Sequence, residues 1–148
     1  MTAYCAQSDV ENKVGGTAAL VALTDINNTG ASTVNATVLN AAIESASATI
    51  DAYINKAVLV PLAVVPPVIK HLAARLAAYE LRAAKRNVDP ETHGKVYEDD
   101  IKMLDAIKSG DITLGVDPAP LKPSARIDAQ SDRSTTKPRS RLNLRGFS

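Results

Sequence analysis

Aromatic residues are scarce in this chain, and their scarcity restricts the kind of core that it can build. The 148 residues include no Trp, one Phe and four Tyr. The core must therefore come from Ala, Val, Leu and Ile, and alanine-rich segments favour closely packed helices. A hydrophobic content of 45% is ordinary for a soluble protein, and the length suits one domain. We expect a small all-α domain of about four to five helices.

Cysteine and targeting segments are also scarce. Cys5 is the only cysteine, which excludes an intrachain disulfide and a cysteine metal cluster. No basic region followed by an apolar run near the N-terminus indicates a secretory signal. The uncharged apolar stretch 57–69 contains three prolines, so it is not expected to span a membrane. We expect synthesis in a reducing cytoplasm and no membrane partner.

The charge is unevenly distributed along the chain. The net charge is +1, but residues 1–115 hold 10 Lys+Arg and 13 Asp+Glu, whereas residues 116–148 hold 7 and 3. The second segment also has four prolines and few large apolar groups, a composition typical of disorder in isolation. Ordering it would cost roughly 1–2 kcal/mol per residue in backbone entropy. We therefore predict a helical domain, 1–115, and a basic C-terminal arm, 116–148, ordered by partner chains.

Capping and spacing signals predict the helices of the body. Ser8-Asp9-Val10-Glu11 has the spacing of a capping box, which predicts a short helix that stops at Gly15-Gly16. A second short helix is expected over 17–23. Apolar residues spaced four, three, four, three and four apart predict a long helix over 37–56. They are Leu39, Ile43, Ala46, Ile50, Tyr53 and Ala57.

Prolines and glycine mark the later elements. Pro67 fits the first turn of a helix, where its missing N–H costs nothing. Its apolar face is expected to include Leu72 and Leu76. Asp89 as cap and Pro90 as first helical residue predict a last helix that ends at Gly110. The segment 111–115 predicts a short extended strand.

Patterns for metal binding are incomplete. Asp25, Asn27, Thr29 and Gly30 match the first half of a calcium-binding EF-hand loop, but its twelfth position, normally Glu, is Ala36. A polar turn before a helix is the better interpretation. The two histidines, His71 and His93, lie far apart without the partner residues of a metal motif. We expect no metal.

Patterns for catalysis are weaker still. The run Glu98-Asp99-Asp100 points around a helix rather than toward one spot, which indicates a solvated face rather than an acid–base pair. Cys5 has no neighbouring base that would make it a nucleophile. No Gly-rich phosphate loop is present. We expect neither a cofactor nor an enzyme activity.

The end of the arm mixes basic with apolar side chains that could bind a partner. Its basic groups would neutralise DNA phosphates without reading sequence. The interleaved apolar groups favour docking on an acidic protein surface instead, with DNA as the alternative. The residues are Arg139, Arg141, Leu142, Leu144, Arg145 and Phe147.

Two helices separated by an apolar, proline-containing connector resemble a known family. The motifs are "IDAYI", "VPLAVVPP" and "VIKHLAARLAAYEL", preceded by "ALVALTDINNTG" and "VLNAAIESASATIDAYI". Together they resemble the head–tail connectors of Mu-like phages, which are neck or head-completion adaptors. The resemblance covers about residues 4–115. It is weakest around Gly15-Gly16, and the arm shows no matching motif.

The resemblance implies a structural virion protein of the neck, between capsid and tail. Such connectors are all-α and form a ring, usually dodecameric, beneath the portal protein. The ring extends the channel for genomic DNA, without sequence specificity, and offers a platform to the next neck or tail-completion protein. In this chain the connector residues expected at a subunit or portal interface are Val58, Leu59, Val60, Leu62, Val64 and Val65.

Two other functions remain as alternatives. A small helical DNA-binding regulator would use the helices around Pro66-Pro67 as a helix-turn-helix. The proline-containing segment between these two helices is too long and apolar for the usual short turn, and the following helix has mainly Ala and Leu between its few basic residues. The other alternative is a soluble helical adaptor without a phage role. Binding of the free protein to an operator would favour the role of a regulator, and binding to the portal would favour the role of a head–tail connector protein.

Overall fold

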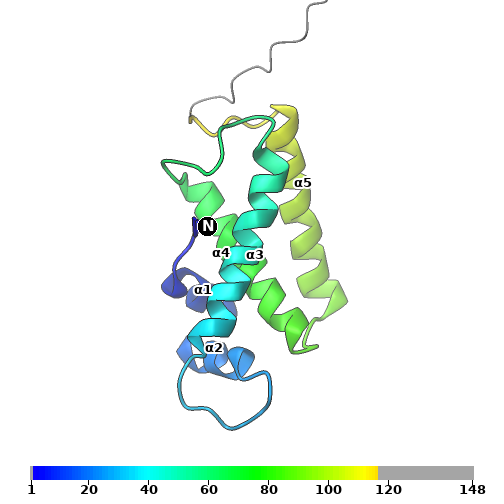
Figure 1. The fold of residues 1–148 in the computed structure, drawn as a ribbon. Helices are drawn as coiled ribbons and strands as arrows, with labels where there is room; N and C mark the ends of the chain where they lie inside the picture. Colours follow the sequence, from blue (N-terminus) through cyan, green and yellow to red (C-terminus); the bar gives the residue numbers. More distant parts are fainter. Residues whose placement is uncertain (1, 117–148) are drawn as a thin grey trace, which may run out of the picture.

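The structure is a computed structural model that describes residues 2–116 (Figure 1). This part of the chain is helical and contains no strand, which confirms the predicted all-α fold. Only the first residue of the predicted arm, Val116, lies within it. The elements are α1 (Gln7–Val14), α2 (Thr17–Thr24), α3 (Ala36–Ile54), α4 (Pro67–Ala84), η1 (Pro90–Gly94) and α5 (Lys95–Ser109).

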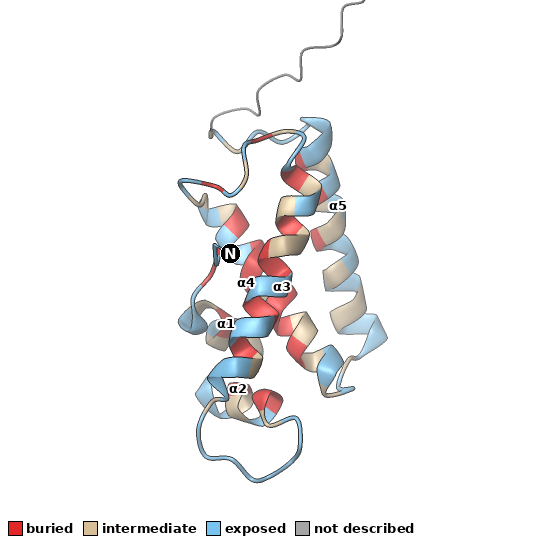
Figure 2. Ribbon diagram, in the orientation of Figure 1, coloured by how far each residue is buried: buried red, intermediate tan, exposed pale blue. Residues whose placement is uncertain are grey.

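Helices α3 and α4 form the centre of the bundle (Figure 1). They run in opposite directions and are joined at one end by residues 55–66, called the connector below. Helix α1 packs on α4, and α5 packs on both α3 and α4. The buried positions gather where these helices face one another (Figure 2). Helix α4 therefore contacts each of the other α-helices.

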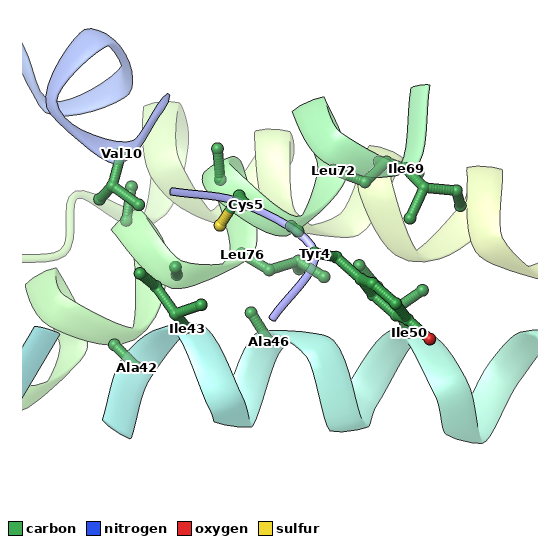
Figure 3. Close-up of a cluster of buried hydrophobic side chains, with 14 of the residues drawn as sticks. Tyr4, Cys5, Val10, Ala42, Ile43, Ala46, Ile50, Ile69, Leu72 and Leu76 are labelled. Atoms are coloured by element: carbon green, nitrogen blue, oxygen red, sulfur yellow. The ribbon is translucent and has the colours of Figure 1, made fainter. Parts of the chain in front are cut away.

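The core has the alanine-rich composition that the scarcity of rings predicts. Four alanines of α4 are buried beside its larger side chains, and small residues allow neighbouring helices to approach closely. Leu76 lies in the same cluster, next to Ala46 and Ile43 of α3 (Figure 3). The buried residues of α4 are Ile69, Leu72, Ala73, Ala74, Leu76, Ala77, Ala78 and Leu81.

Most predicted helix ends are confirmed. Gly15 and Gly110 follow α1 and α5 with φ of 103° and 88°, left-handed conformations that suit glycine. Pro67 is the first residue of α4. The Asp89 carboxylate accepts the N–H of Glu91 at 3.2 Å and caps η1, a π-helical turn that continues into α5.

Two local predictions were wrong. The first helix is capped at Ala6 rather than Ser8, because the Asp9 carboxylate accepts the N–H of Ala6 at 2.8 Å. The expected strand at 111–115 does not form. Instead, the N–H of Ile112 bonds the carbonyl of Ala106 at 3.2 Å, which closes the end of α5. The backbone donor that a strand would need is thus used by the helix terminus.

Candidate interaction surfaces

The connector presents apolar side chains both inward and outward. Val58 and Leu62 are buried in the core. Leu59 and Val64 are 53% and 72% exposed, which is unusual for large apolar side chains on one short segment. Val58 and Leu62 therefore anchor the connector on one side, while its other side is open to solvent. The Val60–Pro61 peptide bond is cis.

Tyr4 holds this segment against α3. Its hydroxyl accepts the backbone N–H of Leu62 at 3.0 Å and donates to the carboxylate of Asp51. Its own backbone N–H donates to Ser47 Oγ at 3.1 Å. Burial, together with the bond to Asp51, raises the pKa of Tyr4 to about 12, so the phenol stays neutral. The ring lies above α3 beside Ile50 (Figure 3).

A cavity of about 450 Å³ adjoins the exposed side of the connector. The connector contributes Leu59 and Val64 to its wall, and the end of the described chain contributes Gly115 and Val116. Val116 also packs against the core. The exposed connector surface is thus a hollowed apolar patch next to the point where the arm begins.

The residues predicted at an interface occupy three different environments. Val58 and Leu62 belong to the core, Val60 and Val65 are partly buried, and only Leu59 and Val64 are exposed. The sequence alone does not show which of these six connector side chains turn toward the core. The predicted arm residues lie outside the described part of the chain: Arg139, Arg141, Leu142, Leu144, Arg145 and Phe147.

The carboxylate run of α5 is not wholly a solvated face. Glu98 and Asp99 are exposed, as predicted, but Asp100 is only 2% exposed. Its carboxylate forms an ion pair with the Arg75 guanidinium at 2.8 Å. Burial raises the pKa of Asp100 to about 6, although the charge of Arg75 acts in the opposite direction. The prediction for Asp100 was wrong because position 100 lies one helical turn before Leu104, on the inward face.

Tyr4 and Asp100 are the two contact residues that sequence reasoning missed. Tyr4 could have been suspected because a tyrosine in a chain with so few rings usually buries its ring and bonds its hydroxyl. Asp100 could have been suspected from its spacing of four and seven to the buried Leu104 and Ile107. Neither sequence pattern identifies the residue that the side chain contacts, because that residue lies in another part of the fold.

The first half of the apparent calcium loop is a hydrogen-bonded turn. The Asp25 carboxylate accepts N–H bonds from Thr29 at 2.9 Å and from Gly30 at 2.9 Å, and it accepts the Thr29 hydroxyl as well. These bonds, the one from the Thr29 N–H first, lower the pKa of Asp25 to about 2. The polar-turn interpretation accounts for this geometry. Within residues 2–116 no cluster of His, Cys, Asp and Glu side chains could hold a metal ion.

The remaining candidates for chemistry have ordinary surroundings. Cys5 is buried, and burial raises the pKa of its thiol to about 11, so it lacks thiolate character. His93 Nδ1 accepts the N–H of Asp89 at 3.0 Å, and His71 is exposed on α4. Across residues 2–116 no helix is both long enough and apolar enough to cross a membrane.

The geometry of α4 disfavours a helix-turn-helix. A recognition helix must project a polar face that can enter the major groove. Helix α4 instead lies between α1, α3 and α5, and most of its central turns are buried. The connector between α3 and α4 spans residues 55–66 rather than a short turn. This arrangement gives α4 a structural place in the core.

Comparison with known proteins identifies relatives in Mu-like phages. The family described as Bacteriophage Mu, Gp36 matches residues 4–132. A curated relative, the Mu-like prophage FluMu protein gp36 of Haemophilus influenzae (strain ATCC 51907 / DSM 11121 / KW20 / Rd), is 36% identical over 75 residues. That alignment covers 51% of this chain and 51% of the relative. The chain thus matches about half the length of this relative.

Proposed function

This chain belongs to the Bacteriophage Mu Gp36 family, and from that premise we propose that it is a structural virion protein that connects phage head and tail. In this proposal, copies of the chain form a dodecameric ring beneath the portal protein. The ring extends the DNA channel and provides a platform for the next neck or tail-completion protein. No catalytic step is part of this role.

The exposed side of the connector is the observation that supports this proposal most directly. Leu59 and Val64 project from a segment whose buried side is held by Val58, Leu62 and the Tyr4 hydroxyl. Apolar surface that is already held in place loses little conformational entropy when a partner covers it. A ring of identical subunits can cover such a surface repeatedly, because each copy presents it in the same position.

One other exposed apolar side chain lies far from the connector. Ile26 lies in the loop between α2 and α3, at the opposite end of the bundle from the connector (Figure 1). Its side chain is 44% exposed, so it resembles Leu59 and Val64 in chemistry but not in place. This gives the proposal a matched control.

The test is binding to phage heads that contain portal. Val64→Asp should weaken co-sedimentation with these heads by about tenfold or more, because a charge replaces apolar surface at the contact. Ile26→Asp should bind like the unchanged protein. Both variants should keep the helical circular dichroism and the melting temperature, since both side chains are exposed.

Native mass spectrometry supplies a second readout. We expect a mostly monomeric free protein that assembles into a ring when portal is present. If Val64→Asp and Ile26→Asp bind heads equally well, the connector is not the contact. A stable dimer that forms without regard to portal would also contradict the proposal.

A further inference from the structure

A second cavity lies at the other end of α4 and has a different chemistry. Its volume is about 450 Å³, and residues of α1, α4, η1 and α5 line it. Three of these residues, Lys13, Arg75 and Arg82, are cationic, and one, Asp100, is a carboxylate. The surrounding body, residues 1–115, has more acidic than basic residues. The cavity is therefore a locally basic site on an acidic domain.

Two of the three cations form no ion pair in the described chain, although Lys13 lies near enough to Asp100 for its charge to act on that carboxylate. Arg75 is satisfied by Asp100 at 2.8 Å. Within residues 2–116, neither Lys13 nor Arg82 forms an ion pair. The Arg82 guanidinium donates a long bond of 3.4 Å to the backbone carbonyl of Lys13, which places both residues on the same wall. Burial lowers the pKa of Arg82, yet a guanidinium stays charged in proteins.

An aromatic wall completes the cavity. The rings of Tyr79 and Tyr97 stack with their centroids 4.3 Å apart and an angle of 22° between their planes. Both rings line the cavity, and Val96 at its rim is 41% exposed. Burial raises the pKa of Tyr97, so its phenol remains a neutral hydrogen-bond donor. The site thus offers cations and an apolar surface side by side.

We propose that this cavity binds an acidic side chain of a partner protein. The Asp or Glu carboxylate would be held by Arg82 and Lys13, since a guanidinium binds carboxylates through charge-assisted hydrogen bonds. An apolar neighbour of that acidic residue would lie against Tyr79 and Tyr97. The inference does not depend on the connector role, because it concerns the opposite end of α4.

A protein carboxylate fits the site better than nucleic acid does. Duplex DNA presents its phosphates along a broad surface, and proteins neutralise them with several outward-facing cations. Here the cations line a cavity that has room for only one or two side chains. The excess of acidic residues on the body would oppose the approach of a polyanion such as DNA more than that of a single carboxylate.

Nuclear magnetic resonance titration of the full-length protein tests the ligand class. The probes are N-acetyl-glutamyl-leucine amide, its glutaminyl counterpart, and inorganic phosphate, compared at equal ionic strength. The glutamyl probe should shift the Arg82 side-chain N–H and the ring signals of Tyr79 and Tyr97 saturably. It should bind at least about fivefold tighter than the glutaminyl probe, because ionised acceptors form the stronger bonds. Equal binding of the two peptides, or tighter binding of phosphate, would overturn the proposal.

Matched variants test the location. Arg82→Gln should weaken binding of the glutamyl probe by about fivefold or more. Arg86→Gln should change it by less than about twofold, because Arg86 is exposed beyond the end of α4 and does not line the cavity. Lys13→Gln provides a second variant should Arg82→Gln lose its helical circular dichroism. If Arg82→Gln and Lys13→Gln both stay folded, or only one does, and the folded variant binds the glutamyl probe as tightly as the unchanged protein, the site lies elsewhere.

Discussion

The two ends of α4 differ in how their surfaces arise. At its N-terminal end the connector is a run of neighbouring apolar residues, with Leu59 and Val64 left exposed. At its C-terminal end a basic cavity combines Lys13, Arg82 and the Arg75–Asp100 pair from three helices. The apolar surface is visible in consecutive letters, whereas the charged one exists only after folding. A surface made of consecutive residues can be recognised in the sequence, whereas a surface assembled from several helices cannot.

The largest expected effect comes from breaking the core that holds both ends in place. Leu76→Asp should lower the free energy of unfolding by about 4 kcal/mol or more, because it buries an unpaired carboxylate and removes apolar contacts. The domain should then be largely unfolded at room temperature. Thermal melts followed by circular dichroism measure this. Glu98→Ala, on an exposed position of α5, is the control, and equal melting temperatures would contradict the core assignment.

The next change loosens the connector end alone. Tyr4→Phe should lower the free energy of unfolding by about 1–3 kcal/mol, because the buried N–H of Leu62 loses its acceptor. Hydrogen exchange at Leu62 should become faster, while amides of α5 should change less. Urea unfolding and exchange measured by nuclear magnetic resonance check both expectations.

Tyr53→Phe provides the control for this change. It removes the same atom from a partly buried ring whose hydroxyl forms no hydrogen bond with residues 2–116. Its effect should stay within about 0.5 kcal/mol. If both substitutions cost the same, the Tyr4 hydroxyl does not hold the connector.

A pH series addresses the charged end. The pKa of Asp100 is raised in the folded protein to about 6, so the folded state binds this proton more tightly than the unfolded state. The contribution of Asp100 to stability should therefore fall as the pH rises from about 4 to about 6, and then stay level. Asp100→Asn should abolish this titration, so the difference in stability between the unchanged protein and the variant should decline between about pH 4 and pH 6. Urea unfolding across the pH range measures it.

Glu98→Gln is the matched control for the pH series, because it neutralises an exposed carboxylate on the same helix. Its difference curve should lack the decline between about pH 4 and pH 6. A decline of the same size in the Glu98→Gln difference curve, or no decline in the Asp100→Asn difference curve, would show that Asp100 does not titrate as its burial implies.

The smallest effect on stability is expected from removing the arm. A chain cut after Val116 keeps all the buried contacts described here, so its free energy of unfolding should change by less than about 1 kcal/mol. Binding to heads that contain portal should nevertheless fall, if the arm docks on a partner. Neutralising Arg139, Arg141 and Arg145 in the full chain should weaken binding in part and reduce its salt dependence. Tight binding by the cut chain would remove the arm from the assembly role.

Local signals account for the part of the fold that could be predicted. Pro67 starts α4 because it needs no N–H partner there, and Gly15 and Gly110 end α1 and α5 because they adopt positive φ. Asp89 caps the turn that leads into α5. Each of these effects acts within a few residues, so the local sequence is enough to predict it. The strand expected at 111–115 failed because the same kind of local bond closed α5 instead.

The sequence by itself thus determined an all-α body rich in alanine, its main helix boundaries, an apolar connector between α3 and α4, and the basic composition of the arm. Only the tertiary structure decided which connector residues are buried and which are exposed. It also joined Tyr4 to Leu62, 58 positions apart, and Arg75 to Asp100. The physical reason is range: caps and turns depend on adjacent residues, whereas burial and ion pairing depend on which distant helices meet.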